Sequence, residues 1–257
     1  MTNTELKRTA KSIRKRIFQF TTKSGFGHLA SSLSCVDILT SLYYDEKTVF
    51  DHKEDVLIFS KTHGSPAIYP TLVDFGYIKE AELEKYSTPE GILRMHADNS
   101  IPGCCYVGGS LGNGLGYGAG LAYKSDKKVF VLLGDAELYE GSIWESLMFI
   151  AHNKINNLHI VVDRNGLGIL GKTEELLKLE PLADKFKSFG FDVHTIDGHN
   201  FEELRNVFSI TDNEKPVAVI ANTIKGKGVS YMEGIWQYHT IIPKEKELLD
   251  VGIKELS

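Results

Sequence analysis

The sequence has little cysteine, no excess of basic residues and no long apolar run. Its three cysteines, Cys35, Cys104 and Cys105, are odd in number and form no Cys-x-x-Cys pair. This argues against a disulfide framework or a cysteine zinc site, and favours a cytoplasmic protein. The 29 basic residues are fewer than the 34 acidic ones, which counts against nucleic acid as the main partner. No window approaches the roughly 18 consecutive apolar residues of a membrane-spanning helix, so we expect no membrane association.

The chain also lacks internal repeats, low-complexity tracts and linkers rich in proline, glycine or serine. With 42% hydrophobic and 25% charged residues it has the composition of a globular protein. We therefore expect residues 1–257 to form a single domain. Its parts are a helical N-terminal approach over 1–54, a main parallel-sheet region over 55–230 and a C-terminal tail over 231–257.

The N-terminus is basic but lacks the apolar core of a secretory signal. A basic, amphipathic start is compatible with a transit peptide, and also with an integral first helix. The second interpretation is favoured because apolar residues recur every three to four positions, in one continuous stripe. The stripe consists of Leu6, Ala10, Ile13, Ile17 and Phe20.

Apolar runs rich in β-branched residues alternate with helical patterns along the chain. The runs cover residues 129–133, 158–162, 192–196 and 217–221, with an earlier candidate at 55–60. The helical patterns cover 182–189, 201–208 and 142–155, the last with one side formed by Trp144, Leu147, Met148 and Ala151. This alternation predicts an α/β fold with three αβα layers, in which helices cover both faces of a parallel sheet. Further upstream, Ser65-Pro66 predicts the start of a helix that runs through Asp74 and stops at Gly76.

Two polar residues follow neighbouring predicted strands. Asp135 follows the strand at 129–133 after Gly134, and Asn165 follows the strand at 158–162. One right-handed crossover would place the two strands side by side, so that both residues lie at the same sheet edge. Magnesium takes carboxylate and other oxygen ligands together with phosphate oxygens. Asp and Asn at strand ends are also common turn residues, so a metal site and a simple turn both remain open from these residues alone.

A glycine-rich run covers residues 108–120. It contains no strict Gly-x-Gly-x-x-Gly and precedes its strong strand, so it is not a dinucleotide-binding fingerprint. Each glycine weakens a helix by about 1 kcal/mol. A helix retained here implies close packing, close approach of a ligand at its start, or both.

Four of the nine histidines lie among small or turn-forming residues: His28, His63, His96 and His239. A single histidine of this kind is usually structural. Four of them flanking the glycine run and the strand ends raise the prospect of a cluster for proton transfer or phosphate binding. A zinc site is not favoured, because no His-x-His or His-x-x-x-His pair occurs among them.

Together these features resemble the transketolase family. Gly134-Asp135 followed by Asn165 is similar to the thiamine diphosphate signature, which begins Gly-Asp-Gly and ends about 30 residues later in Asn. Further similar segments follow in the family's order at residues 24–28, 32–34, 60–67, 109–115, 140–145, 196–199 and 223–230. The resemblance spans about residues 6–242 and implies the thiamine diphosphate-binding fold of the family's diphosphate domain.

The resemblance implies a site for thiamine diphosphate and Mg²⁺. Asp135, Asn165 and the backbone carbonyl of Leu167 would hold Mg²⁺, which in turn holds the diphosphate. Gly134 and Ala136 would approach the diphosphate. The loop beside the aminopyrimidine would consist of Gly109, Ser110 and Leu111.

The resemblance also implies roles for the histidines and for two glutamates. His63 would bind the cofactor, and His239 would lie near the diphosphate and the reacting centre. His28 and His96 would face the substrate hydroxyls, so that His28, His96 and His239 serve proton transfer. Glu140 and Glu145 would belong to a proton network between two active sites. The implied reaction is transfer of a two-carbon ketol unit from a ketose, or ketose phosphate, to an aldose acceptor.

In the family, a pyrimidine-binding domain supplies a glutamate that activates the cofactor, and the resemblance here covers only the diphosphate domain. The chain is therefore similar to the N-terminal subunit of split transketolases. We expect it to be active only with a C-terminal subunit, in an α2β2 complex.

Two departures from the family pattern leave alternatives open. Ala136 replaces the third glycine of the signature, and Leu29-Ala30-Ser31 is closer to deoxyxylulose-phosphate synthases, which decarboxylate pyruvate. The alternatives are a decarboxylating carbon–carbon ligase of that type and a non-catalytic assembly subunit.

Overall fold

The computed structural model describes residues 1–211 and 214–257. The strands are β1 Val56–Phe59, β2 Val129–Gly134, β3 Leu158–Arg164, β4 Asp192–Asp197 and β5 Val217–Asn222. The α-helices are α1 Asn3–Ser24, α2 Leu29–Ser34, α3 Val36–Tyr44, α4 Tyr69–Asp74, α5 Ala81–Glu84, α6 Asn113–Tyr123, α7 Gly141–His152, α8 Thr173–Leu176, α9 Leu182–Ser188, α10 Phe201–Phe208 and α11 Lys246–Glu255. Three 3₁₀-helices complete the described elements: η1 Thr62–Ala67, η2 Asp135–Tyr139 and η3 Trp236–His239.

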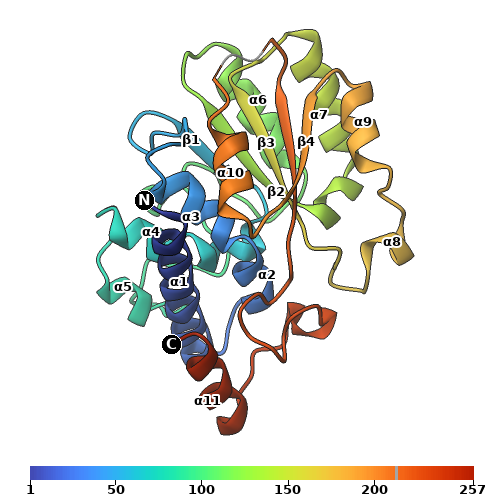
Figure 1. Ribbon diagram of the computed structural model, residues 1–257. Coiled ribbons are helices and arrows are strands. Elements are labelled where there is room, and N and C mark those ends of the chain that lie inside the picture. Colours follow the sequence, from blue (N-terminus) through green and yellow to red (C-terminus); the bar gives the residue numbers. More distant parts are fainter. Residues whose placement is uncertain (212–213) are drawn as a thin grey trace.

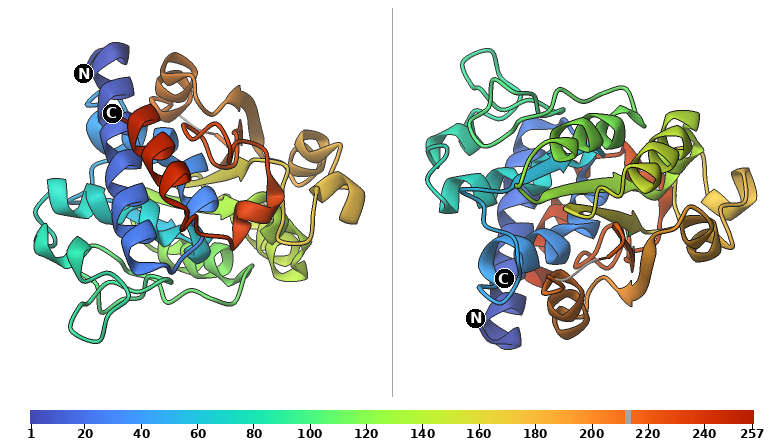
Figure 2. Two further views of the ribbon diagram at one scale, coloured as in Figure 1. Left: turned by 90° about the horizontal axis from the view of Figure 1, so that it is seen from below. Right: turned by 90° about the horizontal axis from the view of Figure 1, so that it is seen from above.

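The strands form one parallel sheet in the order β1-β2-β3-β5-β4. Alternate residues of each strand face opposite helix layers. Phe130 and Leu132 of β2 pack with α1, α3 and α10, whereas Val131 and Leu133 pack with α6, α7 and α9. Figures 1 and 2 show the sheet between these two layers. The predicted three-layer αβα fold is confirmed.

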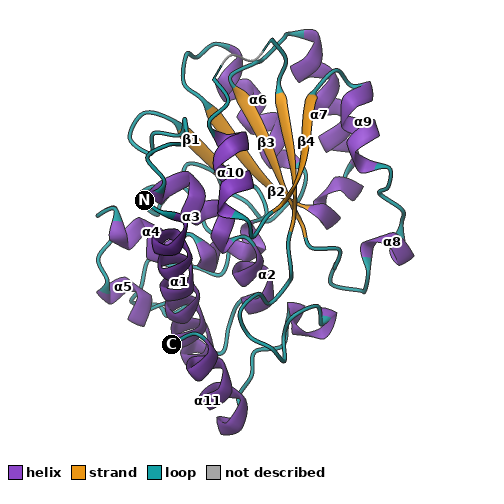
Figure 3. Cartoon of the chain, viewed as in Figure 1, coloured by secondary structure: helices purple, strands orange, loops and turns teal. Residues whose placement is uncertain are grey.

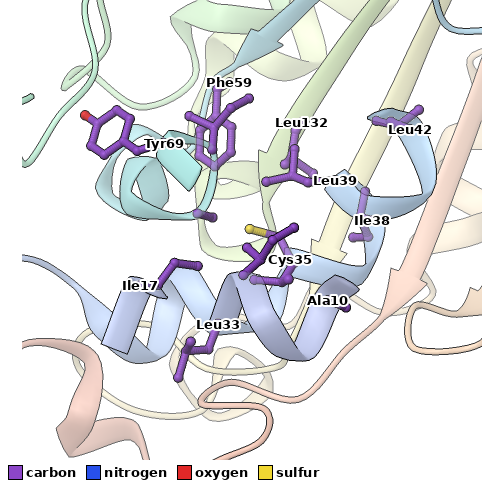
Figure 4. Close-up of a cluster of buried hydrophobic side chains, with 14 of the residues drawn as sticks. Ala10, Ile17, Leu33, Cys35, Ile38, Leu39, Leu42, Phe59, Tyr69 and Leu132 are labelled. Atoms are coloured by element: carbon purple, nitrogen blue, oxygen red, sulfur yellow. The ribbon is translucent and has the colours of Figure 1, made fainter. Parts of the chain in front are cut away.

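The N-terminal helices extend the first of these layers beyond the sheet. In the view of Figure 3 the strands occupy the upper half of the molecule, and α1 and α11 the lower half. Thr2 and Glu5 form a capping box at the start of α1, and Gly25, with a φ of +71°, ends the helix. The predicted apolar stripe of α1 is buried, and Figure 4 shows Ala10 and Ile17 packed near α2 and α3. The first segment is therefore an integral helix.

Three sequence-based predictions of local structure are wrong. Ser65 lies inside η1, and the following α-helix starts only at Tyr69, because Ser65-Pro66 is part of a tight 3₁₀ turn. Met148 of α7 is 57% exposed, because the buried face of that helix is turned by one residue and consists of Ile143, Leu147 and Ile150.

The third wrong prediction concerns the strand at 192–196, which exists but is not covered by helices on both faces. β4 lies at the edge of the sheet and consists of exposed and half-buried residues.

No helix in the described part of the chain is both long and apolar enough to cross a membrane.

Candidate active site

A cavity of about 220 Å³ lies where β1, β2 and β3 end. Position at the carboxyl ends of parallel strands is the usual location of a ligand site in such sheets. The cavity brings together most of the residues predicted from the sequence: His63, His96, Gly109, Leu111, Gly134, Asp135, Ala136, Asn165, Leu167 and His239. Its lining also includes residues to which the sequence analysis gave no role: Lys61, Thr62, Glu137, Ile169 and Lys225.

Asp135 begins η2 immediately after β2 and is 2% exposed. Its Oδ2 accepts hydrogen bonds from the Gly166 N–H at 2.6 Å and from Arg164 Nη1 at 3.2 Å, and its Oδ1 accepts one from the Ala136 N–H at 2.8 Å. Burial, and then the negative charge of Asp163, raise the pKa of Asp135, while the hydrogen bond from Gly166 and the charge of Arg164 oppose this rise. Asp135 is thus a buried carboxylate with a partly compensated charge.

Asn165 and Leu167 add uncharged oxygen atoms beside this carboxylate. β2 and β3 are neighbours in register, with Gly134 opposite Asp163, so that Asp135 and Asn165 follow adjacent strand ends. The Leu167 carbonyl lines the same cavity and accepts a hydrogen bond from Lys225 Nζ at 2.7 Å. One carboxylate with amide and carbonyl oxygens is a donor set that suits a hard cation such as Mg²⁺. In residues 1–211 and 214–257, no cluster of three or more His, Cys, Asp or Glu side chains is placed to hold a metal.

Two buried lysines line the cavity together with the carboxyl groups of Asp135 and Glu137. Lys61 pairs with Asp163, and both side chains are almost completely buried. Burial disfavours the Lys61 ammonium, but the charge of Asp163 outweighs this effect and raises the pKa of Lys61. Burial and then the charge of Lys61 lower the pKa of Lys225 to about 8. Lys225 therefore remains mostly an ammonium at neutral pH, and contributes a positive field suited to an anionic ligand.

The four histidines converge from distant parts of the chain. Their ring centroids are 4.9 Å apart for His28 and His239, 5.4 Å for His63 and His239, 5.7 Å for His28 and His63, and 6.1 Å for His28 and His96. His28 does not line the cavity itself, but it contacts the other three rings. The predicted histidine cluster is therefore present.

Hydrogen bonds and burial define the chemical state of these rings. His28 Nδ1 donates to the backbone carbonyl of His239 at 2.9 Å, which leaves its Nε2 available as an acceptor. His239 Nδ1 is buried and has no hydrogen-bond partner among the described residues. Burial lowers the pKa of all four histidines, and that of His239 to about 3 with help from the charges of Lys225 and His28. Neutral imidazoles at physiological pH can accept a proton from a hydroxyl group.

The glycine run combines close packing with a place at the cavity. A Cβ on Gly114 would lie 2.2 Å from Ser60 Oγ, and one on Gly118 would lie 2.6 Å from a methyl group of Val131. Gly109, with a φ of +117°, lines the cavity. Close packing of the run is therefore confirmed, and approach of a ligand beside it stays a prediction.

Ser110 and Glu140 do not line the cavity. Ser110 is exposed, between the two lining residues Gly109 and Leu111. Glu140 is exposed at the N-cap of α7 and lies next to Gly112, since a Cβ on Gly112 would be 2.5 Å from that of Glu140. Glu145 is also exposed, one turn further along α7.

Comparison with protein families identifies a match over nearly the whole chain. The family described as "Transketolase, thiamine diphosphate binding domain" matches residues 6–252. The chain is 38% identical over 256 residues to a subunit of apulose-4-phosphate transketolase from Phocaeicola vulgatus, covering 95% of this chain and 91% of that protein. It is 35% identical over 265 residues to the 6-deoxy-6-sulfo-D-fructose transketolase subunit SqwG of a Clostridium species, covering 98% of this chain and 96% of that protein.

Longer transketolases match over less than half of their own length. Human transketolase is 32% identical over 262 residues, which cover 98% of this chain but 42% of the human protein. The crystal structure of transketolase from Campylobacter jejuni superposes with a TM-score of 0.89 at 26% identity, covering 100% of this chain and 43% of that chain. The chain thus belongs to the transketolase family and contains its thiamine diphosphate-binding domain.

Proposed function

We propose that this chain is the thiamine diphosphate-binding subunit of a split transketolase. With Mg²⁺ and a partner chain, it transfers a two-carbon ketol unit from a ketose phosphate to an aldose acceptor. The observation that carries this proposal is the cavity that joins the oxygen donors after β2 and β3 to His63, His96 and His239, whose rings cluster around that of His28. Family membership supports the same reaction, because the relatives named above are transketolases.

The residues present fit the cofactor. Asp135, Asn165 and the Leu167 carbonyl would hold Mg²⁺, and the Lys225 ammonium, 2.7 Å from that carbonyl, is placed to neutralise a diphosphate. His239 Nδ1, which has no hydrogen-bond partner within residues 1–211 and 214–257, offers a further polar contact. The remaining contacts to the cofactor would come from His63, Gly109, Ser110, Leu111, Gly134 and Ala136. When bound, thiamine diphosphate supplies the nucleophilic carbon and the electron sink for cleavage of the carbon–carbon bond.

Proton transfer falls to the chain's own side chains. His28 donates from Nδ1 to a backbone carbonyl, so its Nε2 is fixed as a base toward a substrate hydroxyl. We assign the same kind of role to His96, which contacts Thr62 Oγ1 through Nδ1 at 3.2 Å, and to His239. Glu140, beside Gly112 at the start of α7, would belong to a proton network that links this active site to the second one across the subunit interface.

A partner chain would complete the site. Relatives of similar length are named as subunits of transketolases. Large apolar side chains are exposed at the cavity and close to it in the chain. Ile169 lines the cavity and is 51% exposed, and Trp236, in the same 3₁₀-helix as His239, is 40% exposed; such surfaces mark interfaces. We propose that a C-terminal subunit with the pyrimidine-binding domain covers this surface. Two-fold closure would give an α2β2 complex.

The names of the relatives also indicate a class of donor sugar. Apulose-4-phosphate and 6-deoxy-6-sulfo-D-fructose are both anionic ketoses, so we propose an anionic sugar as donor. We further propose a cytoplasmic location, where such sugars are metabolised.

The experiment is reconstitution. The purified chain is assayed for ketol transfer alone and after mixing with its pyrimidine-binding partner, with thiamine diphosphate and Mg²⁺ present. We expect no transfer from the chain alone and transfer on mixing. Full activity of the single polypeptide would overturn the split-subunit proposal. Consumption of pyruvate with release of carbon dioxide, without ketol transfer, would overturn the reaction in favour of a decarboxylating ligase.

A further inference from the structure

Glu137 joins three segments around the cavity through one buried carboxylate. The residue lies in η2, is 1% exposed and lines the cavity. Its Oε1 accepts hydrogen bonds from the Gly112 N–H at 2.9 Å and from the Ser60 hydroxyl. Its Oε2 accepts one from the Gly134 N–H at 3.2 Å. The ends of β1 and β2 and the start of α6 are thereby connected by a single side chain.

All three partners of Glu137 are donors, and its two carboxyl oxygens together accept from all of them. Burial raises the pKa of Glu137, and the hydrogen bonds from Ser60, Gly112 and Gly134 oppose this rise. The conformation of Gly112 leaves little freedom to the loop. Its φ is +86°, and a Cβ at this position would collide with the side chains of Glu140 and Ser142. Gly112 therefore packs closely against the start of α7, while its N–H donates to Glu137.

The two backbone groups held by Glu137 belong to opposite ends of the proposed cofactor site. Gly134 lies beside the oxygen donors that would hold Mg²⁺ and the diphosphate, whereas Gly112 follows the loop with Gly109 and Leu111. We propose that Glu137 is a positioning residue, which sets the spacing between the diphosphate end and the aminopyrimidine end of the site. This inference rests on the proposed function, because it assumes that the cofactor spans the cavity.

Glu137→Gln tests the inference at nearly constant volume. The amide keeps one acceptor oxygen, and its NH₂ group faces an N–H donor at Gly112 or at Gly134, so one of the two connections is lost. We expect the affinity for thiamine diphosphate with Mg²⁺ to fall about 10- to 100-fold, as for the loss of one charge-assisted hydrogen bond. The affinity is measured by calorimetric titration of the full chain with its partner, well below the unfolding midpoint of each variant.

Asp45→Asn is the matched control. Asp45 is a 2% exposed carboxylate at the end of α3, outside the cavity lining, and accepts hydrogen bonds from Arg205 Nε at 2.6 Å and from the Lys47 N–H at 3.3 Å. We expect this variant to unfold at a lower temperature and to bind the cofactor as the wild type does. If Glu137→Gln does not fold, Glu137→Asp replaces it, because the shorter carboxylate cannot reach both backbone groups.

The outcomes separate the two proposals. Loss of affinity in the Glu137 variant alone supports the positioning role. Wild-type affinity in a folded Glu137 variant overturns it, and so does an equal loss in Asp45→Asn, since the effect would then be one of general stability. Absence of cofactor binding in the wild-type complex overturns the proposed function itself.

Discussion

Replacing Asp135 by asparagine removes the charge from the proposed metal site and leaves its shape nearly unchanged. The carboxylate accepts one hydrogen bond on Oδ1 and two on Oδ2. Whichever oxygen becomes an NH₂ group, it faces an N–H donor. One charge-assisted hydrogen bond is lost, at about 1.5–3 kcal/mol, and this loss is partly offset because a charge no longer has to be buried. We therefore expect the free energy of unfolding to fall by about 1–2 kcal/mol.

The effect on cofactor binding should be much larger than the effect on stability. Changes in residues that only support a metal ligand already cost about 10- to 100-fold in metal affinity. A variant that lacks the only carboxylate of the oxygen donor set should therefore bind Mg²⁺ and thiamine diphosphate at least about 100-fold more weakly. The local control is Thr173→Val. Thr173 contacts Arg164 Nη1 at 2.6 Å, so its loss disturbs the surroundings of Asp135 but removes no proposed ligand.

Calorimetric titration of the reconstituted complex with thiamine diphosphate, at fixed Mg²⁺, measures the affinity, and thermal unfolding without cofactor measures the stability. We expect a large loss of affinity in Asp135→Asn and a small one in Thr173→Val. Unchanged cofactor affinity in a folded Asp135→Asn variant would refute the assignment of this carboxylate to the metal.

Three further predictions concern other residues. His28→Ala should lower turnover by about 10²- to 10⁴-fold with cofactor affinity nearly intact, whereas His63→Ala should weaken cofactor binding. Calorimetric titration measures the affinity of both variants. An equal loss of cofactor affinity in the two would show that their roles are wrongly divided. Burial lowers the pKa of His159 in the folded chain to about 4. As the pH falls, His159 is therefore protonated in the unfolded chain before it is protonated in the folded one. Stability is then lost from about pH 6.5 down to about pH 4, by up to about 3 kcal/mol, and denaturant titrations should show a flatter pH profile for His159→Leu. Gly118→Ala should destabilise the chain, because the added methyl group would collide with Val131 of β2. Gly120→Ala should stabilise it by about 1 kcal/mol, because the added methyl group would have no neighbouring atom within 4 Å and alanine favours the helix. Similar unfolding midpoints for the two variants would contradict this.

The sheet and its covering helices were predictable because burial leaves a strong periodic pattern. Strands covered on both faces are buried throughout and mostly apolar, as in β2 and in β3 up to Val162. The helix predicted at 201–208 is found with the same bounds as α10. At the edge of the sheet this rule weakens, because β4 meets solvent and its pattern of exposure does not follow from its β-branched residues.

The site was predictable as a set of residues, but its connections were not. The resemblance to transketolases selected Asp135, Asn165 and the four histidines, and the structure brings these together. The contact of Lys225 with the Leu167 carbonyl joins residues 58 positions apart, and that of Glu137 with Gly112 joins residues 25 apart. Lysine and glutamate are commonly surface residues, so composition gives no signal that these two are buried.

The wrong face predicted for α7 carries information about the proposed partner. The helix is apolar on more than one side, so its periodicity fits two registers, and packing against the sheet selects Ile143, Leu147 and Ile150. Met148 and Phe149 are then left 57% and 42% exposed. They lie beside α6, where Tyr123 packs against Phe149 at 5.4 Å and is itself 45% exposed. Large apolar side chains that gather on an exposed face mark an interaction surface. Packing within the described chain leaves this second apolar face of α7 exposed. The proposed partner subunit would bury it. The ambiguity in the sequence therefore supports an interface on this face of α6 and α7.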